Sequence, residues 1–204
     1  MELTERRIIL VQVFTDEGVV GLGDIDGPPA GSMACVSLVQ DTFRPLLIGK
    51  NPLEIGARGQ DMFVVLNTLG RYKSLESYVL GAIDIALWDI LGKVTGQPIR
   101  RRLGERRNSL SCYASLGQLE TNQLSKEIGR YASEGFGGVK IRIGFPNSDD
   151  ASIVSAARSV LPAGSPTKLM ADVNSGWSRA FALSRGRRLE EHQLFWLEEP
   201  WPPF

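Results

Sequence analysis

The sequence has few of the residues that build zinc sites and disulfide scaffolds. Its 204 residues include two cysteines and one histidine. Cys35 and Cys112 show no metal-ligand spacing and are too few for a disulfide framework, so we expect two buried thiols. His192 lies just before the last predicted strand, away from the strand ends where parallel α/β proteins place catalytic groups, and we expect no catalytic role for it.

The sequence also lacks an excess of either charge and any long hydrophobic run. Lys and Arg together number 23, as do Asp and Glu, so no net field attracts nucleic acid or an anionic membrane. The N-terminal stretch MELTERRIILVQVF has acidic residues where a signal peptide would be basic, and no apolar run approaches the roughly 18 residues that cross a bilayer. We therefore expect a globular, cytoplasmic protein with neither a nucleic-acid nor a membrane partner.

The first part of the chain begins with a predicted β-hairpin. RIILVQVF (residues 7–14) and VVGLGDI (19–25) are rich in β-branched and apolar residues, and Gly18 lies at the turn between them. The glycines of GVVGLGDIDG do not form a dinucleotide-binding loop, because the spacing fails at Asp26 and no helix follows directly. The pattern predicts a hairpin and not a phosphate site.

Three helices are predicted after the hairpin. Apolar residues recur at helical spacing in residues 34–47 and 52–69, which the breaker GKNP separates. The stretch SLESYVLGAIDIALWDILGKVTGQPI predicts a long helix that starts at the N-cap Ser74 and is ended by Gly96 and Pro98. Because this helix is strongly apolar, we expect it to be largely buried.

After about residue 108 the pattern changes to short apolar runs that alternate with amphipathic helices. Successive strands are separated by about 25 to 30 residues, which is typical of βα units with parallel strands. This indicates a (β/α) barrel or a doubly wound sheet, although only four strands are predicted where a closed barrel needs eight. The predicted strands are residues 110–115, 137–143, 168–173 and 194–199, and the predicted helices are 122–134, 150–161 and 178–191.

Two cations lie at the end of the second predicted strand. In VKIRIG, Lys140 and Arg142 are two residues apart and therefore share one face of the strand. Ile141 and Ile143 then face the opposite side, where the helices pack. The C-terminal ends of parallel strands carry the chemistry in α/β proteins, so this pair is a candidate for a functional role.

Carboxylates end the next two predicted strands. Asp172 ends KLMAD, Asn174 has the same parity, and Glu198 ends the last strand. Carboxylate and amide oxygens without a nearby thiol or imidazole suit a hard divalent ion such as Mg²⁺ better than zinc. The sequence therefore predicts a magnesium site at the C-terminal edge of the sheet.

Each of these residues also has an ordinary structural interpretation. A Lys-x-Arg pair on a strand is usually a solvated face, and an acid at a strand end often caps the following helix. Because the polar residues recur at the same end of successive units, we prefer the functional interpretation. Glu199 alternates away from Glu198, and for it a salt bridge and a functional role are both open.

At these residues the sequence resembles the mandelate racemase/muconate lactonizing enzyme family of the enolase superfamily. GAIDIALWDILGKVTGQPIRRRLG is similar to the family's capping-domain helix, GFGGVKIRIG to its second-strand lysine motif, MADVNSGW to its third-strand aspartate and WLEEP to its fourth-strand glutamate. KIRIGFP followed by DDASIVSAAR is closest to the mandelate racemase branch. The resemblance implies an α+β capping domain (1–107) followed by the first half of a (β/α) TIM-type barrel (108–204).

Carried over residue by residue, the resemblance makes Asp172 and Glu198 two of the family's three carboxylate ligands of Mg²⁺. Lys140 and Arg142 take the two lysine positions of its Lys-x-Lys motif, of which the second is commonly the base that removes a proton α to a substrate carboxylate. Arginine stays protonated, with a pKa above roughly 12, so we expect Arg142 to clamp a carboxylate or hydroxyl instead. The implied activity is that of a racemase or epimerase (isomerase) or a sugar-acid dehydratase (lyase), with Asn174 as a substrate-binding residue.

The resemblance also implies parts that these 204 residues do not hold. In the family the third metal ligand ends strand five, a further base lies on strand six or seven, and an additional strand and loop precede the stretch matching RIILVQVF. We therefore expect a chain that is clipped at both ends and has negligible catalytic activity by itself.

Assembly is the alternative function. A half-barrel leaves unpaired edge strands, which favour self-association, so we expect a homo-oligomer and keep a non-catalytic homo- or hetero-assembly module as the second hypothesis. A gene product with no role is a third. The substrate of an enzyme would be a small hydroxy acid or sugar acid, whose identity the sequence does not specify.

Overall fold

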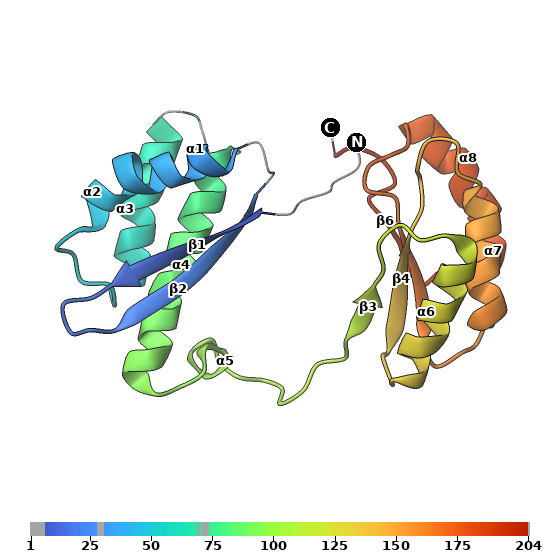
Figure 1. Ribbon diagram of the computed structural model, residues 1–204, viewed down its shortest axis with the longest axis horizontal. Coiled ribbons are helices and arrows are strands. Elements are labelled where there is room, and N and C mark those ends of the chain that lie inside the picture. The colour runs from blue at the N-terminus through green and yellow to red at the C-terminus, as the bar shows by residue number, and fades with distance from the viewer. Residues whose placement is uncertain (1–6, 28–30, 69, 71–73, 204) are drawn as a thin grey trace. The chain divides into compact units, whose positions relative to one another are not determined.

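The computed structural model describes residues 7–27, 31–68, 70 and 74–203 (Figure 1). The chain divides into two compact units, Met1–Arg106 and Arg107–Phe204. Each unit has its own cluster of buried apolar side chains.

The first unit begins with the predicted hairpin. Strand β1 (Arg7–Phe14) pairs antiparallel with β2 (Val20–Gly27), and Gly18 has a φ of 79° in the connecting turn. That conformation is strained for residues with a side chain, so the glycine is required there. The helical segments that follow are α1 (Ser32–Ser37), the π-helix η1 (Leu38–Phe43), α2 (Arg44–Leu47), α3 (Ile55–Thr68), α4 (Leu75–Thr95) and α5 (Ile99–Arg102).

Two glycines of β2 allow the hairpin to lie directly on α4. A Cβ added at Gly21 would lie 2.1 Å from the carbonyl oxygen of Ala86, and one at Gly23 would lie 1.9 Å from that of Ala82. The glycines that resemble a phosphate loop in the sequence are therefore explained by close packing of backbone against backbone.

Side chains of α4 also occupy the outer edge of β2. Asp89 Oδ2 accepts a hydrogen bond of 2.9 Å from the backbone N–H of Leu22, and Lys93 Nζ donates one of 2.7 Å to the carbonyl oxygen of Val20. Asp89 and Lys93 are themselves joined at 2.7 Å. These contacts fix the hairpin to α4 through polar as well as apolar groups.

The predicted helices are present, with shifted starts and one irregularity. Residues 34–47 are helical as predicted, but their middle is a π-helix, whereas α3 begins three residues later than predicted. Ser74 is the N-cap residue of α4, yet its hydroxyl donates to Glu76 and does not accept from the helix backbone. At the other end Gly96 adopts the left-handed conformation with a φ of 60°, as expected of a helix terminator. In the described ranges no helix is long and apolar enough to cross a membrane.

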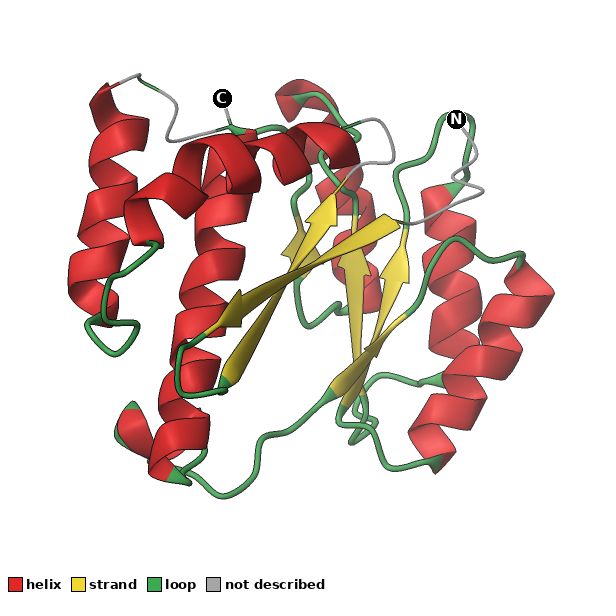
Figure 2. Cartoon of the chain, turned by 60° about the vertical axis from the view of Figure 1, so that its left-hand side comes forward, coloured by secondary structure: helices red, strands yellow, loops and turns green. Residues whose placement is uncertain are grey.

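The second unit contains a four-stranded parallel sheet in the order β3-β4-β5-β6 (Figure 2). Its strands are β3 (Tyr113–Ser115), β4 (Gly138–Arg142), β5 (Lys168–Asp172) and β6 (Leu197–Glu198). The connecting helices are α6 (Thr121–Ser133), α7 (Asp150–Val160) and α8 (Arg179–Leu189), followed by the 3₁₀ turn η2 (Glu190–His192). The alternation of parallel strands and helices is as predicted, although β3 and β6 are shorter than the apolar runs suggested.

One prediction about the thiols is wrong. Cys35 is buried in the core of the first unit, as expected, but Cys112 is exposed. Cys112 lies immediately before β3, and Leu110 and Tyr113 on either side are also exposed. The strand predicted from residue 110 therefore begins later, at Tyr113, and the residues before it are uncovered.

Candidate active site

The two faces of the parallel sheet differ in character. Val139, Ile141, Leu169 and Ala171 point to one face and belong to the buried cluster that also contains side chains of α6, α7 and α8. Figure 1 shows these helices on one side of the strands. Because side chains alternate along a strand, the residues between these apolar positions share the other face.

Lys140, Asp172 and Glu198 meet on that other face. The ammonium group of Lys140 donates hydrogen bonds of 3.1 Å to Asp172 Oδ2 and 2.8 Å to Glu198 Oε1. The side chains of Lys140 and Asp172 are 9% and 3% exposed, whereas that of Glu198 is 35% exposed. The structure thus brings three of the five predicted site residues into direct contact.

The register of the sheet produces this arrangement. Arg142 pairs with Asp172, and Asp172 pairs with Glu198, so the ends of β4, β5 and β6 lie at one level. Lys140 stands one side-chain step earlier on β4, and its long side chain reaches up to the two carboxylates. The sequence rule that parallel strands end at a common edge is sufficient to explain the convergence.

Each carboxylate has its second oxygen fixed by an N–H group. Asp172 Oδ1 accepts a hydrogen bond of 2.8 Å from the backbone N–H of Asn174, and Glu198 Oε2 accepts one of 3.2 Å from Trp196 Nε1. The remaining oxygens, Asp172 Oδ2 and Glu198 Oε1, are the ones that face the ammonium group of Lys140. Trp196 was not among the predicted site residues, although its spacing of two residues from Glu198 is that of side chains on one face of a strand.

The environment of Lys140 keeps it charged. Burial alone would lower its pKa, but the hydrogen bonds from its ammonium group to Glu198 and Asp172 outweigh burial and raise the pKa above the ordinary value. Lys140 is therefore protonated at neutral pH. In this arrangement its ammonium group acts as a hydrogen-bond donor to both carboxylates.

Arg142 and Asn174 stand at the edge of this cluster. Arg142 is the last residue of β4 and is exposed, so its guanidinium group is accessible. Asn174 is also exposed, but strand alternation does not place its side chain, because β5 ends at Asp172 and Asn174 has a φ of 48°. The parity argument for Asn174 was therefore wrong, and what the structure assigns to this residue is the backbone contact with Asp172.

The backbone continues to pair after the last strand residues. The N–H of Ser175 donates to the carbonyl oxygen of Glu199 at 2.7 Å, and the N–H of Trp177 donates to that of Pro200 at 3.3 Å. Asn174, Ser175 and Glu199 all have left-handed φ values, of 48°, 60° and 41°. The side chain of Glu199 is exposed.

His192 lies before β6, where the sequence placed it. It is in the 3₁₀ turn η2, and its backbone carbonyl accepts a hydrogen bond from Arg158 Nε. Its ring is 3.9 Å from the carboxylate of Glu191. Nothing in these contacts gives His192 a part in the cluster around Lys140.

Two aromatic side chains, Tyr113 and Trp196, lie next to the polar cluster. Tyr113 and Trp196 contact each other edge to face at a centroid distance of 5.4 Å, and Phe195 lies 5.3 Å from Trp196. The ammonium group of Lys140 is 5.8 Å from the centre of the Tyr113 ring. The rings hold the Trp196 side chain between two neighbours.

Comparison with known proteins identifies the fold. Residues 2–104 match the model of the mandelate racemase/muconate lactonizing enzyme N-terminal domain, and residues 123–204 match the enolase C-terminal domain-like model. The chain belongs to the mandelate racemase/muconate lactonizing enzyme family. The first unit is accordingly the N-terminal capping domain of this family, and the parallel sheet is part of its barrel, which confirms the resemblance found in the motifs.

Individual relatives agree with this assignment. L-talarate/galactarate dehydratase of Salmonella typhimurium is 33% identical over 202 residues, covering 97% of this chain and 50% of the relative. A racemase from Streptomyces coelicolor with bound magnesium has a TM-score of 0.89 at 29% identity, over 96% of this chain and 55% of that one. L-talarate dehydratase from a Polaromonas species, complexed with Mg and L-glucarate, has a TM-score of 0.86 at 30% identity, over 98% and 56%. The chain spans about half the length of these mandelate racemase family members.

The chemistry of the cluster fits the magnesium that these two solved structures contain. Asp172 Oδ2 and Glu198 Oε1 are hard oxygen donors that already converge on one cation, the ammonium group of Lys140. Mg²⁺ is commonly bound by one or two carboxylates and completes its shell with water or substrate. Within the described part of the chain, no group of three or more Asp, Glu, His or Cys residues is arranged to hold a metal ion.

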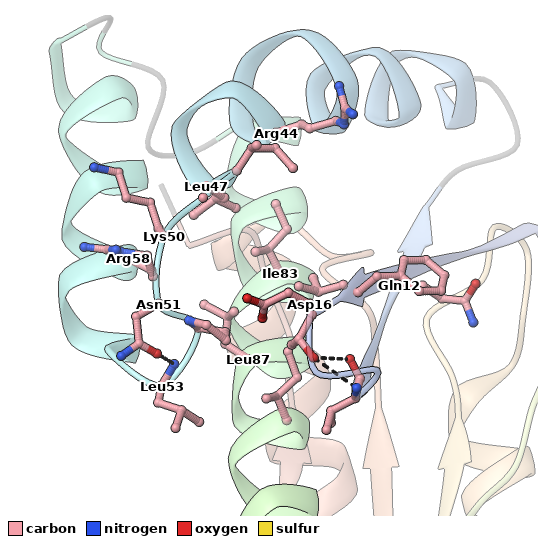
Figure 3. Close-up of a pocket in the computed structure, with 18 of the residues that line it drawn as sticks. Gln12, Asp16, Arg44, Leu47, Lys50, Asn51, Leu53, Arg58, Ile83 and Leu87 are labelled. Carbon is pink, nitrogen blue, oxygen red and sulfur yellow. Dashed lines mark hydrogen bonds between the residues drawn. The ribbon is translucent and has the colours of Figure 1, made fainter.

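A cavity also lies away from the sheet, in the capping domain. It has a volume of about 970 Å³ and lies between the hairpin, the loop of residues 48–53 and α4. Figure 3 shows Leu47, Ile83 and Leu87 along it, while the charged ends of Arg44 and Lys50 point away from one another. We place the candidate active site on the sheet, because there a buried ammonium group and two carboxylates are in direct contact.

Proposed function

We propose that Lys140, Arg142, Asp172 and Glu198 form the metal-binding and acid-binding half of the active site of a Mg²⁺-dependent enzyme. Its reaction is removal of the proton α to the carboxylate of a hydroxy acid or sugar acid, leading to racemisation, epimerisation or dehydration. The single observation that carries the proposal is the contact of one buried ammonium group with carboxylates of two neighbouring strands. The relatives named for galactarate, talarate and L-glucarate support an acidic sugar as the substrate.

In this proposal Asp172 and Glu198 hold the metal ion. Both present one oxygen toward a common point while the other is occupied by an N–H donor. When bound there, Mg²⁺ would supply the positive charge that polarises the carboxylate of the substrate. The protein's part is to keep the two oxygens in place before the ion arrives.

The two cations of β4 orient the substrate. Lys140 has a raised pKa, and an arginine such as Arg142 is a poor base at neutral pH. The planar guanidinium group of Arg142 is exposed beside the cluster and suits a bidentate contact with a carboxylate. Arg142 is therefore a binding group and not the proton acceptor, and the exposed amide of Asn174 is available for a substrate hydroxyl.

The assembly hypothesis has less support. Each of the three relatives described above is named for a chemical reaction. Assembly into a homo-oligomer stays a prediction that sedimentation at micromolar concentration tests.

Titration with Mn²⁺, followed by electron paramagnetic resonance, tests the metal site. Mn²⁺ accepts the same oxygen ligands as Mg²⁺. The 204-residue chain should bind Mn²⁺, Mg²⁺ should displace it, and Asp172→Asn or Glu198→Gln should weaken binding at least tenfold. Glu199→Gln is the matched control, because it removes the neighbouring exposed carboxylate and should leave the affinity unchanged. Equal loss in Glu198→Gln and Glu199→Gln would show that Mn²⁺ binds nonspecifically to acidic residues and would contradict the proposal.

A second measurement concerns the acid-binding half. Galactarate or L-glucarate, added to the Mn²⁺-loaded chain, should alter the Mn²⁺ spectrum, and Arg142→Met should weaken this effect more than Arg179→Met, which changes an exposed arginine at the start of α8. Exchange of the α-proton in deuterated water, followed by proton NMR, should be negligible for the 204 residues alone.

A further inference from the structure

The two carboxylates of the candidate site are oriented by different kinds of donor. Asp172 is 3% exposed, and its Oδ1 accepts a hydrogen bond from the backbone N–H of Asn174, two residues later in the chain. Glu198 is 35% exposed, has one more rotatable bond and lies on a strand of only two residues. Of the two, Glu198 is the carboxylate whose position depends more on a side-chain partner.

Trp196 is placed to be that partner. It stands two residues before Glu198 and on the same face, and its Nε1 donates to Glu198 Oε2 at 3.2 Å. The indole is itself confined, by the edge-to-face contact with Tyr113 and the contact with Phe195. Because packing fixes the indole ring, the hydrogen bond from its N–H fixes the orientation of the Glu198 carboxylate.

We propose that Trp196 is a positioning residue for the metal site: its indole N–H fixes one oxygen of Glu198 so that the other converges with Asp172 on the cation. The inference rests on the proposed function, in which Asp172 and Glu198 hold Mg²⁺. Without the N–H, the Glu198 carboxylate can rotate, and the two oxygens that meet at the Lys140 ammonium group lose their common direction. Both metal ligands are then still present, but their oxygens are no longer held in position for the ion.

Replacement of Trp196 by phenylalanine isolates the hydrogen bond. Trp196→Phe keeps an aromatic ring against Tyr113 and Phe195 but removes the donor. We expect it to weaken Mn²⁺ binding about tenfold, because partners that orient metal ligands typically contribute a factor of ten or more to affinity. The matched control is Trp201→Phe, which changes an exposed tryptophan of the same unit and should leave the affinity within about twofold of wild type.

A double-mutant cycle separates positioning from general loss of structure. In a Glu198→Gln background, Trp196→Phe should cause no further loss of Mn²⁺ affinity, since its effect passes through the carboxylate. A purely structural role would lower the affinity by the same factor in both backgrounds. Equal Mn²⁺ affinity of Trp196→Phe and wild type would overturn the inference while leaving the metal site intact.

The indole N–H gives a readout that needs no metal. The chain has four tryptophans, so a ¹⁵N-tryptophan sample gives few indole signals, and Trp196→Phe identifies the one from Trp196. Glu198→Gln should shift this signal, and Glu199→Gln should not. An unshifted signal would show that the indole N–H does not contact Glu198 and would overturn the inference. A shifted signal in a chain that binds no Mn²⁺ would confirm the contact but overturn the proposed function, and with it the role assigned to Trp196.

Discussion

The capping domain and the barrel part of this chain differ in how their buried polar side chains are paired. Among the described residues, the buried polar side chains of the capping domain are Arg58 and Glu76, and Arg58 is joined to Glu54 and Asp61 on its own helix and the turn before it. In the barrel part, Lys140 and Asp172 come from different strands and meet. Arg58 of the capping domain is thus paired within its own helical segment, whereas the barrel part brings buried charges together from different strands.

The barrel part itself contains two kinds of buried acid. Asp150 accepts hydrogen bonds from the backbone N–H of Gly144 and the hydroxyl of Ser148, and it also pairs with Arg185 of α8. Its oxygens therefore hold the preceding loop and connect it to α8. Asp172 instead directs one oxygen at Lys140. The difference indicates which buried acid is the better functional candidate: the one that directs an oxygen at a cation shared with a second carboxylate.

The sharpest test of this comparison is removal of the shared cation. Lys140→Met leaves Asp172 buried next to Glu198 without a counter-charge, and breaking a buried pair in this way costs about 3 kcal/mol or more. We expect urea unfolding to show this loss in the barrel part, and added Mg²⁺ to restore more stability to Lys140→Met than to wild type. Lys168→Met, at an exposed position on the neighbouring strand, is the control. A variant as stable as wild type without Mg²⁺ would mean that the two carboxylates do not depend on Lys140.

The complementary test is directed at the capping domain. Gly23→Ala places a methyl group against the carbonyl oxygen of Ala82, and because that atom is backbone in the middle of α4, the hairpin must move. We expect a loss of about 1 to 3 kcal/mol, detected by hydrogen exchange as faster exchange in β1, β2 and α4 with the barrel part unchanged. Gly81→Ala, in α4 with open space around the added atom, should instead stabilise by about 0.5 to 1 kcal/mol. Similar effects of the two changes would contradict the close approach of hairpin and helix.

The smallest expected effects concern two acids on α4 with opposite pKa shifts. The hydrogen bond from Lys93 lowers the pKa of Asp89 against the effect of burial, and the N–H of Leu22 adds to the lowering. Its stabilising contribution is therefore present above the ordinary carboxyl pKa, about 4, and is lost as the pH falls through the lowered value. Burial raises the pKa of Asp84, and a hydrogen bond from Trp88 opposes this effect. The charged form of Asp84 therefore destabilises the fold, starting as the pH rises above the ordinary carboxyl pKa and fully above the raised pKa.

Thermal unfolding at neutral pH and at about pH 3 distinguishes the two acids. Asp89→Asn should destabilise and Asp84→Asn should stabilise at neutral pH, each within about 1 kcal/mol, and both differences should shrink at the lower pH. Differences that keep their size at low pH would show that packing and not charge is responsible.

Much of the fold could be predicted because it depends on local patterns. The hairpin follows from two β-branched runs around Gly18, and the end of α4 follows from Gly96. The cluster of Lys140, Asp172 and Glu198 could be predicted as well, since strand parity fixes the face and parallel strands share an edge. These features need only the sequence and the rule that strands pair in parallel.

Other features could not be read from the sequence because they depend on what covers or contacts a residue. Cys112 belongs to an apolar run, but nothing in the run shows that it is left uncovered. Asn174 has the right parity, yet the strand ends before it and the backbone turns to a left-handed conformation. The role of Trp196 depends on a side-chain rotamer, which parity does not determine. The boundaries of β3 and β6 likewise depend on pairing partners.

The pairing of backbone beyond β5 and β6 has a further consequence. Ser175 and Trp177 donate to Glu199 and Pro200, so the segments after the two metal-ligand candidates hold each other, in conformations that residues other than glycine adopt at some cost. Neither segment can change its course without releasing the other. Asp172 and Glu198 are thus followed by backbone segments that cannot move independently of each other, so a shift of one carboxylate is coupled to a shift of the other.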